Sequence, residues 1–113
     1  MLAEKLHAMV FLGARNSRMK DYFDVRALLR EEKMDAAQLA RAIAATFARR
    51  RTVLPEDIPP ALSDRFARDE TKQTQWRAFL GKNRIDAPAL QEVVAEIRTR
   101  LAAPLAQARE AGA

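Results

Sequence analysis

The sequence predicts an all-α protein, a small helical bundle of about five helices. Ala, Leu, Arg, Glu and Gln, which favour helices, dominate its 113 residues. No run of alternating β-branched residues indicates a strand. Apolar residues recur at helical spacing, most clearly in a C-terminal seam of Leu90, Val93, Val94, Ile97, Leu101 and Leu105.

Two helices are expected at the N-terminal end. The first covers residues 2–12 and stops near Gly13, because glycine readily adopts the left-handed backbone that ends many helices. Ser17 is the predicted N-cap of the second, since its hydroxyl can accept a hydrogen bond from a free backbone amide. That helix extends to about Arg30.

A third helix is expected to begin after Asp35. Asp35 and Gln38 have the spacing of a capping box, in which each side chain accepts from the other residue's backbone amide. The helix ends in the arginine run Arg49, Arg50 and Arg51. One arc of its surface is apolar and predicts an ordinary buried stripe, made of Ala36, Leu39, Ala40, Ile43, Ala44 and Phe47.

A proline-rich segment, residues 52–63, follows the arginine run. Its three prolines lack the backbone donors and angles that a helix needs, so it is expected to be a linker. We interpret residues 1–113 as a single helical domain or fragment. A subdivision into motif-bearing helices in residues 1–51 and C-terminal helices in residues 64–113 is the one candidate boundary.

Two longer helices are expected after this segment. Asp69 is the predicted cap of a helix that carries Trp76, interpreted as a packing anchor, and ends at Gly81. Asp86 is the predicted cap of the last long helix, and Pro104 is expected to interrupt that helix late.

Composition excludes several kinds of site. The chain has no cysteine, which rules out disulfides, thiolate metal ligands and a cysteine nucleophile. His7 is its single histidine, so a zinc site is not expected, and we expect no metal site in these residues. No apolar run approaches the roughly 18 residues of a membrane span, and the N-terminus lacks the order of a signal peptide. A cytoplasmic protein without membrane contact is expected.

The chain carries a net charge of +5, shared almost evenly between its two halves. An even spread is a weak signal for nucleic-acid binding. Two local clusters stand out: one of Arg15, Arg18 and Lys20, and the run from Arg49 to Arg51. Each has two interpretations, a solvated surface or a contact with phosphate groups.

Ionisable residues lie within the apolar arcs of the first two helices. On helical wheels Lys5 falls among the apolar residues of the first helix, and Asp21 and Arg18 fall within the apolar arc of the second. Asp24 lies just outside that arc. Burying one charge alone costs several kcal/mol, so two interpretations remain: an interhelical ion pair, or one wall of a polar cavity whose ligand supplies the opposite charge.

Familiar local signatures of catalysis do not occur. The sequence contains no phosphate-binding loop motif, no nucleophile elbow and no metalloprotease motif. An enzymatic interpretation therefore depends on Lys5 and Asp21.

At these residues the sequence resembles a known family. The segments "AEKLHAMVFLG" and "NSRMKDYFDVRAL" resemble two motifs of the nucleotidyltransferase AbiEii/AbiGii toxin family, of type IV toxin–antitoxin and abortive-infection systems. The first motif centres on a lysine, here Lys5. The second has the form R-x-K-D-x-[YF]-D, here Arg18, Lys20, Asp21, Phe23 and Asp24. The segments "ATFARRRTVLP" and "QWRAFLGKNRI" also resemble the helical C-terminal region of these proteins.

The resemblance implies site residues. Lys5 would contact the phosphates of a nucleotide and Asp21 would belong to the catalytic constellation, with Arg18, Lys20 and Asp24 in support. The intact family enzymes are expected to use Mg²⁺ and a nucleoside triphosphate, and in some members the acceptor is tRNA. The partners that the resemblance implies are an antitoxin and an N-terminal catalytic lobe.

One departure from the family pattern is large. The Gly-Ser turn and D-x-D pair of the catalytic lobe do not occur in these residues, so we expect no nucleotide transfer by them alone and no cofactor bound by them alone. The chain is expected to be a truncated, split or C-terminal part of the enzyme. The alternative hypothesis is a freestanding helical module that binds a protein, or nucleic acid through Arg49, Arg50 and Arg51.

Overall fold

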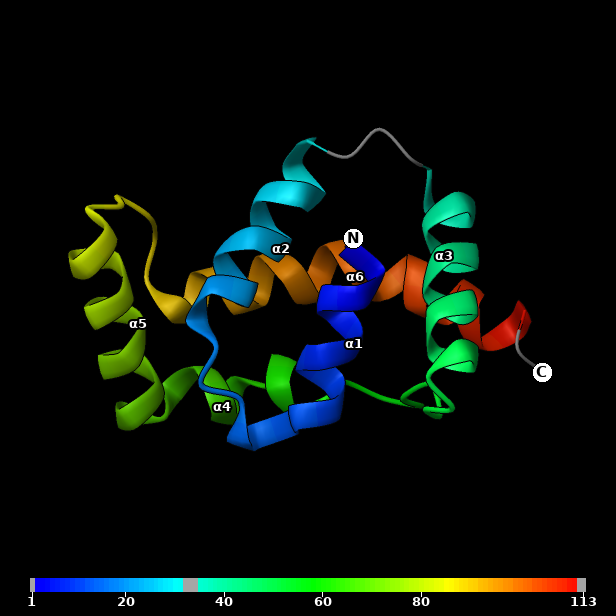
Figure 1. The fold of residues 1–113 in the computed structure, drawn as a ribbon, viewed down its shortest axis with the longest axis horizontal. Helices are drawn as coiled ribbons and strands as arrows, with labels where there is room; N and C mark the ends of the chain where they lie inside the picture. Colours follow the sequence, from blue (N-terminus) through cyan, green and yellow to red (C-terminus); the bar gives the residue numbers. More distant parts are fainter. Residues whose placement is uncertain (1, 32–34, 112–113) are drawn as a thin grey trace.

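The described part of the chain consists of helices joined by short segments (Figure 1). This computed structural model describes residues 2–31 and 35–111. Those residues form six α-helices and no strand, which confirms the all-α prediction. The helices are α1 Leu2–Leu12, α2 Met19–Glu31, α3 Ala36–Arg49, α4 Asp64–Arg68, α5 Glu70–Asn83 and α6 Leu90–Ala111, with 3₁₀ helices at Gly13–Arg15 and Pro60–Leu62.

The long helix α6 runs through the fold, and most of the other helices pack on it (Figure 1). It packs against α2, α3, α4 and α5, while α1 packs on α2 and α3. The predicted seam is buried throughout, and Ala108 extends it. Because this seam is apolar at every helical turn, several helices can bury their own apolar faces against one partner.

Two predicted helix starts are confirmed. Asp35 and Gln38 form the complete capping box at the start of α3. The Asp69 carboxylate accepts the Lys72 backbone amide, 3.0 Å away, and so caps α5. Ser63 likewise caps the short α4. These caps satisfy amides that have no partner inside their own helix.

The predicted Ser17 cap of α2 is wrong. The 3₁₀ helix that begins at Gly13, where φ is +59°, takes up extra residues, and α2 starts only at Met19. The side chain of Asn16, rather than Ser17, accepts the Arg18 backbone amide at 2.9 Å. Asn16 is fully buried, and its carbonyl accepts a hydrogen bond from the Lys72 ammonium.

The predicted features of the last helix are also corrected. Asp86 does not cap α6, which begins four residues later at Leu90. The segment before it carries Pro88, whose carbonyl accepts a hydrogen bond from the indole of buried Trp76 at 3.0 Å. Pro104 does not end α6 either, since the helix continues to Ala111 with Pro104 buried. Packing of this turn outweighs the loss of one backbone hydrogen bond.

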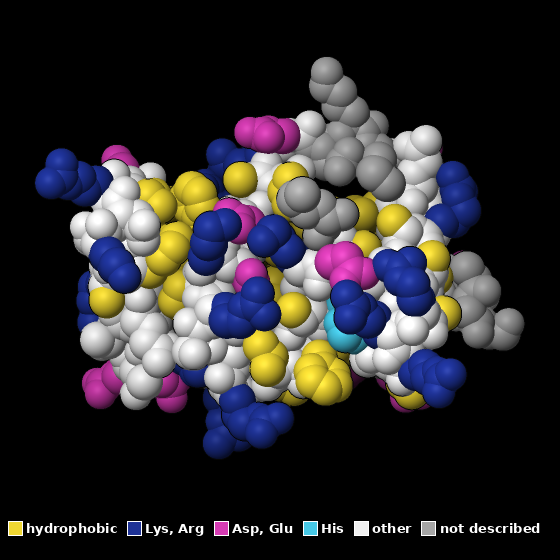
Figure 2. All heavy atoms as spheres, in the orientation of Figure 1, with side chains coloured by type: hydrophobic (Ala, Val, Ile, Leu, Met, Phe, Trp, Pro, Cys, Tyr) yellow, Lys and Arg dark blue, Asp and Glu magenta, His cyan; other side chains and the backbone are white. Residues whose placement is uncertain are grey.

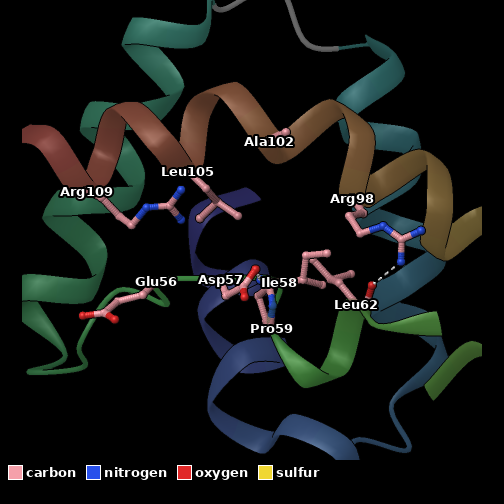
Figure 3. A pocket seen from close by; sticks show the side chains of 9 residues that line it. All are labelled: Glu56, Asp57, Ile58, Pro59, Leu62, Arg98, Ala102, Leu105 and Arg109. Atoms are coloured by element: carbon pink, nitrogen blue, oxygen red, sulfur yellow. Dashed lines mark hydrogen bonds between the residues drawn. The ribbon is translucent and has the colours of Figure 1, made fainter. Parts of the chain in front are cut away.

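The proline-rich segment, residues 52–63, lies along α6 (Figure 3). Arg98 donates to the Leu62 carbonyl at 3.0 Å, and Arg109 donates to the Pro55 carbonyl at 2.9 Å. A largely apolar pocket of about 160 Å³ lies between these two arginines. Both arginines are therefore engaged in holding the segment. The subdivision at this segment stays a prediction.

Within residues 2–31 and 35–111, no helix combines the length and the apolar character that crossing a bilayer requires.

Candidate functional site

The predicted site lies where α1 meets the first turn of α2. Leu2, Leu6 and Met9 bury one face of α1, and Lys5 lies beside this face. Tyr22 and Val25 are fully buried on α2, and Asp21 precedes them. The same apolar packing that joins the two helices therefore brings a lysine and a carboxylate to their boundary.

Lys5 and Asp21 do approach each other, as the helical wheels predicted. The Lys5 ammonium lies 3.9 Å from Asp21 Oδ1, and its side chain is 24% exposed. Asp21 is only 3% exposed. Its carboxylate therefore lies below the surface, with the lysine at the opening.

Asp24 is closer to Lys5 than Asp21 is. The two side chains are 3.0 Å apart, and Lys20 approaches the same Asp24 oxygen at 2.7 Å. Burial alone would raise the pKa of Asp24, but the hydrogen bonds from Lys20 and Lys5 hold it below its usual range. Asp24, at the edge of the apolar arc, is therefore part of the interhelical pairing.

Arg18 is exposed, although the wheel placed it within the apolar arc. It precedes the first residue of α2, so the helical wheel does not describe its direction, and its side chain is 61% exposed. Its Nε lies 3.2 Å from Asp21 Oδ2 without aiming an N–H at that oxygen. The contact is an ion pair rather than a hydrogen bond, and it leaves Asp21 Oδ2 buried without a donor from the residues that the structure describes.

An open groove of about 800 Å³ adjoins these charges, and we call it the Asp21 groove. Its other wall is α5, which packs on α2 through Phe23 and Phe79, with ring centroids 6.0 Å apart. The groove is lined by Lys5, Ser17, Arg18, Met19, Lys20, Asp21, Gln75, Ala78, Phe79, Lys82 and Asn83. Figure 2 shows basic and acidic side chains interspersed over α1 and α2 on this face.

Gln75 and Lys82 were not predicted as site residues. Their segment was part of the family resemblance, but no signal within α5 assigned them to a groove. Gln75 Oε1 is buried without a hydrogen-bond partner among the described residues, as is Asp21 Oδ2. Buried acceptors without donors are costly, so this groove is suited to a ligand or water that donates to them.

The chemistry of the groove favours an anion. Four cations line it, Lys5, Arg18, Lys20 and Lys82, against the single carboxylate of Asp21. Asp24, which pairs with Lys5 and Lys20, still leaves an excess of positive charge. Among the described residues no group of three acidic, histidine or cysteine side chains is arranged to hold a metal ion. The donors therefore fit a polyphosphate better than Mg²⁺ by itself.

The predicted arginine run lies at the C-terminal end of α3. Arg49 and Arg50 both pair with Glu4 of α1. Hydrogen bonds from Arg50 and then Arg49 lower the pKa of Glu4. Arg51 is exposed, with a left-handed φ of 55°. Two of the three arginines thus join α1 to α3, and a contact of the run with nucleic acid stays a prediction.

The fold and the site define an all-helical protein with a groove lined by four cationic side chains beside a buried carboxylate. The family described as nucleotidyl transferase AbiEii toxin, type IV toxin–antitoxin system, matches residues 1–102. The chain belongs to this family, which confirms the resemblance drawn from its motifs. Membership of a toxin–antitoxin family also makes an antitoxin an expected partner. Searches of curated proteins and of solved structures found no match.

Proposed function

We propose that this chain forms the helical wall of a nucleotidyl-transfer site, in which Lys5 holds phosphates of a nucleoside triphosphate. One observation carries the proposal. Lys5 lies between Asp21 and Asp24 at the edge of a groove with excess positive charge. An ammonium group held in this position can pair with the phosphates of an anionic ligand.

The residues around Lys5 have distinct proposed roles. Arg18, exposed beside Asp21, adds a second donor for phosphate oxygens, while Lys20 and Asp24 keep the Lys5 ammonium in place. Asp21, buried with one oxygen that has no donor among the described residues, orients Lys5 and Arg18 and can accept a hydrogen bond from the ligand. In nucleotide transfer an acceptor hydroxyl attacks the α-phosphorus and pyrophosphate leaves, so cations beside the phosphates stabilise the charge that develops.

Mg²⁺ would neutralise phosphate charge in the complete reaction. Its carboxylate ligands are expected from a lobe with the Gly-Ser and D-x-D motifs, which these 113 residues do not contain. The chain is therefore proposed to be inactive by itself and to act with such a lobe. The proposed acceptor is tRNA, modified in the cytoplasm by a toxin of abortive-infection type.

A nucleotide-incorporation assay tests the proposal. Labelled nucleoside triphosphates and tRNA are incubated with the chain, with and without a polypeptide that supplies the Gly-Ser and D-x-D motifs. We expect label in tRNA only with both polypeptides, and a loss of at least about 100-fold with Lys5→Met or Asp21→Asn. Arg41→Met, on an exposed position of α3, is the matched control. Incorporation by these residues alone, or full activity of Lys5→Met, would contradict the proposal.

A second candidate function is a helical binding module. The observation that favours it is the exposure of Arg49 and Arg50, whose side chains are 64% and 54% exposed beside α1. Purified protein should then bind tRNA at about 0.2 M salt, and replacement of Arg49, Arg50 and Arg51 by alanine should abolish this binding. Unchanged binding by the triple variant would exclude these arginines as the contact.

A further inference from the structure

An aromatic pair with one exposed ring lies on α1, beyond Lys5. Phe11 is 67% exposed, and its ring stacks on His7, with centroids 5.8 Å apart and planes 21° from parallel. Aromatic rings contribute most when their faces are covered, so a stacked pair with one free face offers a surface on which another ring can pack.

His7 is firmly held beneath Phe11. Its Nε2 and the Thr52 hydroxyl are 2.7 Å apart and hydrogen-bonded. The buried Phe47 ring and the His7 ring form a T-shaped pair, with centroids 5.1 Å apart and an interplanar angle of 80°. Because contacts on two sides fix the imidazole, the Phe11 ring has a defined platform and its outer face stays available for another ring.

Cations surround this platform. A second groove, of about 580 Å³, contains Lys5, His7, Phe11, Arg18 and Arg50 in its lining. It shares Lys5 and Arg18 with the Asp21 groove. The aromatic face and the buried carboxylate are thus connected through the same two cations.

The charge around Phe11 stays positive after local pairing. Glu4, the acidic residue in this lining, carries one negative charge but pairs with both Arg49 and Arg50. Lys5 and Arg18 add two more cations, which the Asp24 and Asp21 carboxylates balance, so the excess is the one positive charge by which Arg49 and Arg50 exceed Glu4. A purely apolar partner surface gains nothing from these charges, whereas a nucleotide offers both a ring to stack and a phosphate to pair.

We propose that Phe11 is a nucleobase-stacking residue, with Arg18 and Arg50 placed to hold the phosphate of the same nucleotide. The binding of a base rests on this groove alone, while its use in nucleotide transfer rests on the function proposed above. Two sources share this chemistry: a nucleoside triphosphate, and the terminal nucleotide of an acceptor strand. In either case the base lies on Phe11 and its phosphate points toward Lys5.

Ligands with and without bases test the stacking. The affinity of the protein is measured for a labelled single-stranded oligonucleotide and for an abasic strand of the same length, and for ATP and inorganic triphosphate. Phe11→Leu keeps an apolar side chain but removes the ring, and Phe11→Trp enlarges the ring. Ile58→Ala, at another exposed apolar position on the proline-rich segment, is the control. Circular dichroism verifies that each variant is folded.

We expect Phe11→Leu to weaken binding of a base-bearing ligand about tenfold and to leave the matching base-free ligand unchanged. Phe11→Trp and Ile58→Ala should bind like the original protein. A loss confined to the oligonucleotide identifies an acceptor strand, and a loss confined to ATP identifies the nucleotide donor. Equal affinity for ligands with and without bases, or full binding by Phe11→Leu, would overturn the proposal and leave Phe11 as a protein contact.

The outcome is independent of the transfer assay. Binding that depends on Phe11, together with no effect of Lys5→Met on nucleotide incorporation, would support the stacking site and contradict the proposed function. Binding that does not depend on Phe11, together with a loss of nucleotide incorporation in Lys5→Met, would contradict the stacking site and support the proposed function.

Discussion

Lys5 Nζ lies 3.0 Å from Asp24 Oδ2 and 3.9 Å from Asp21 Oδ1, so one ammonium group of α1 links two carboxylates of α2. This relationship makes Lys5 a structural cation as well as a candidate ligand-binding one. Its removal leaves Asp21, at 3% exposure, with Arg18 as its remaining cation among the described contacts. Loss of one partner from a largely buried pair is destabilising.

Lys5→Met should therefore lower the free energy of unfolding by about 1 to 3 kcal/mol. Methionine keeps the apolar stem of the side chain and removes the charge. The control is Lys20→Met, which also removes a cation from Asp24 but acts at a side chain that is 71% exposed. We expect a change within about 0.5 kcal/mol for this control. Urea unfolding measures both, and equal effects would contradict the structural role of Lys5.

Acid should weaken the contact between α2 and α6 at Glu96. Hydrogen bonds from Arg30, aided by Arg26, lower the pKa of Glu96 from 4.5 to about 2. A lowered folded-state pKa contributes stability that is present above pH 4.5 and is lost as the pH falls toward about 2. Because Arg30 is half exposed, the contribution is reduced by solvent to about 1 to 2 kcal/mol.

Urea unfolding of the protein and of Glu96→Gln, followed from neutral pH down to about pH 3, measures this contribution. The difference in unfolding free energy between the two proteins should shrink over that range. A constant difference would show that the Glu96 pairs with α2 do not contribute through charge.

High pH should destabilise the folded protein through Tyr22, its single tyrosine. Burial, with a smaller contribution from nearby Asp21, raises the pKa of Tyr22 well above its usual range. A raised folded-state pKa gives stability that is complete below the unfolded value of about 10 and declines as the pH rises further. Since Tyr22 is the sole tyrosine, tyrosinate absorbance reports it alone. This absorbance should appear at the same pH as the loss of helix. Its appearance at a lower pH, while the helices are intact, would contradict the conclusion that burial raises the pKa of Tyr22.

Tyr22→Phe isolates the hydroxyl of the same residue. The hydroxyl donates to the Ala61 carbonyl at 2.8 Å, and Ala61 is fully buried. We expect the variant to lose about 1 to 2 kcal/mol, because the carbonyl is left without this donor. Thermal unfolding monitored by circular dichroism provides the value, and a neutral result would imply that another donor replaces the hydroxyl.

A glycine at position 84 should stabilise the protein. Arg84 ends α5 with a left-handed φ of 54°, and the Ile85 amide closes the end by donating to the Leu80 carbonyl at 2.9 Å. Glycine adopts this backbone without a Cβ penalty, so Arg84→Gly should raise the free energy of unfolding by about 1 kcal/mol. Arg84→Ala removes the same side chain but keeps the Cβ, and should gain nothing. Thermal unfolding of both variants separates the effect of the left-handed backbone from the effect of removing the arginine charge.

Local chemistry explains which parts of the fold the sequence predicted. Asp35 and Asp69 cap their helices through the backbone amide of the residue three positions further on, so their spacing in the sequence suffices to predict the caps. The starts of α2 and α6 depend on distant partners instead. Asn16 is fixed by Lys72, and Pro88 by Trp76. A single helix pattern carries no information about such contacts.

The same limit applies to the site. A helical wheel gives the side of its own helix on which Lys5 or Asp21 lies. Their approach followed because each lies on the apolar face through which its helix packs. It does not give the crossing of α1 over α2, which brings Lys5 closer to Asp24. Lys82 and Gln75 enter the groove only because α5 packs on α2, a long-range arrangement that periodicity does not encode.

The position of α6 in the chain has a consequence for biosynthesis. Four helices, α2 to α5, are translated before residues 90–111, which contact all of them. Their apolar faces lack the partner that buries them until that moment. Exposed apolar surface on a nascent chain attracts chaperones and aggregates readily. Closure of the core around α6 is thus a late event in the synthesis of these residues.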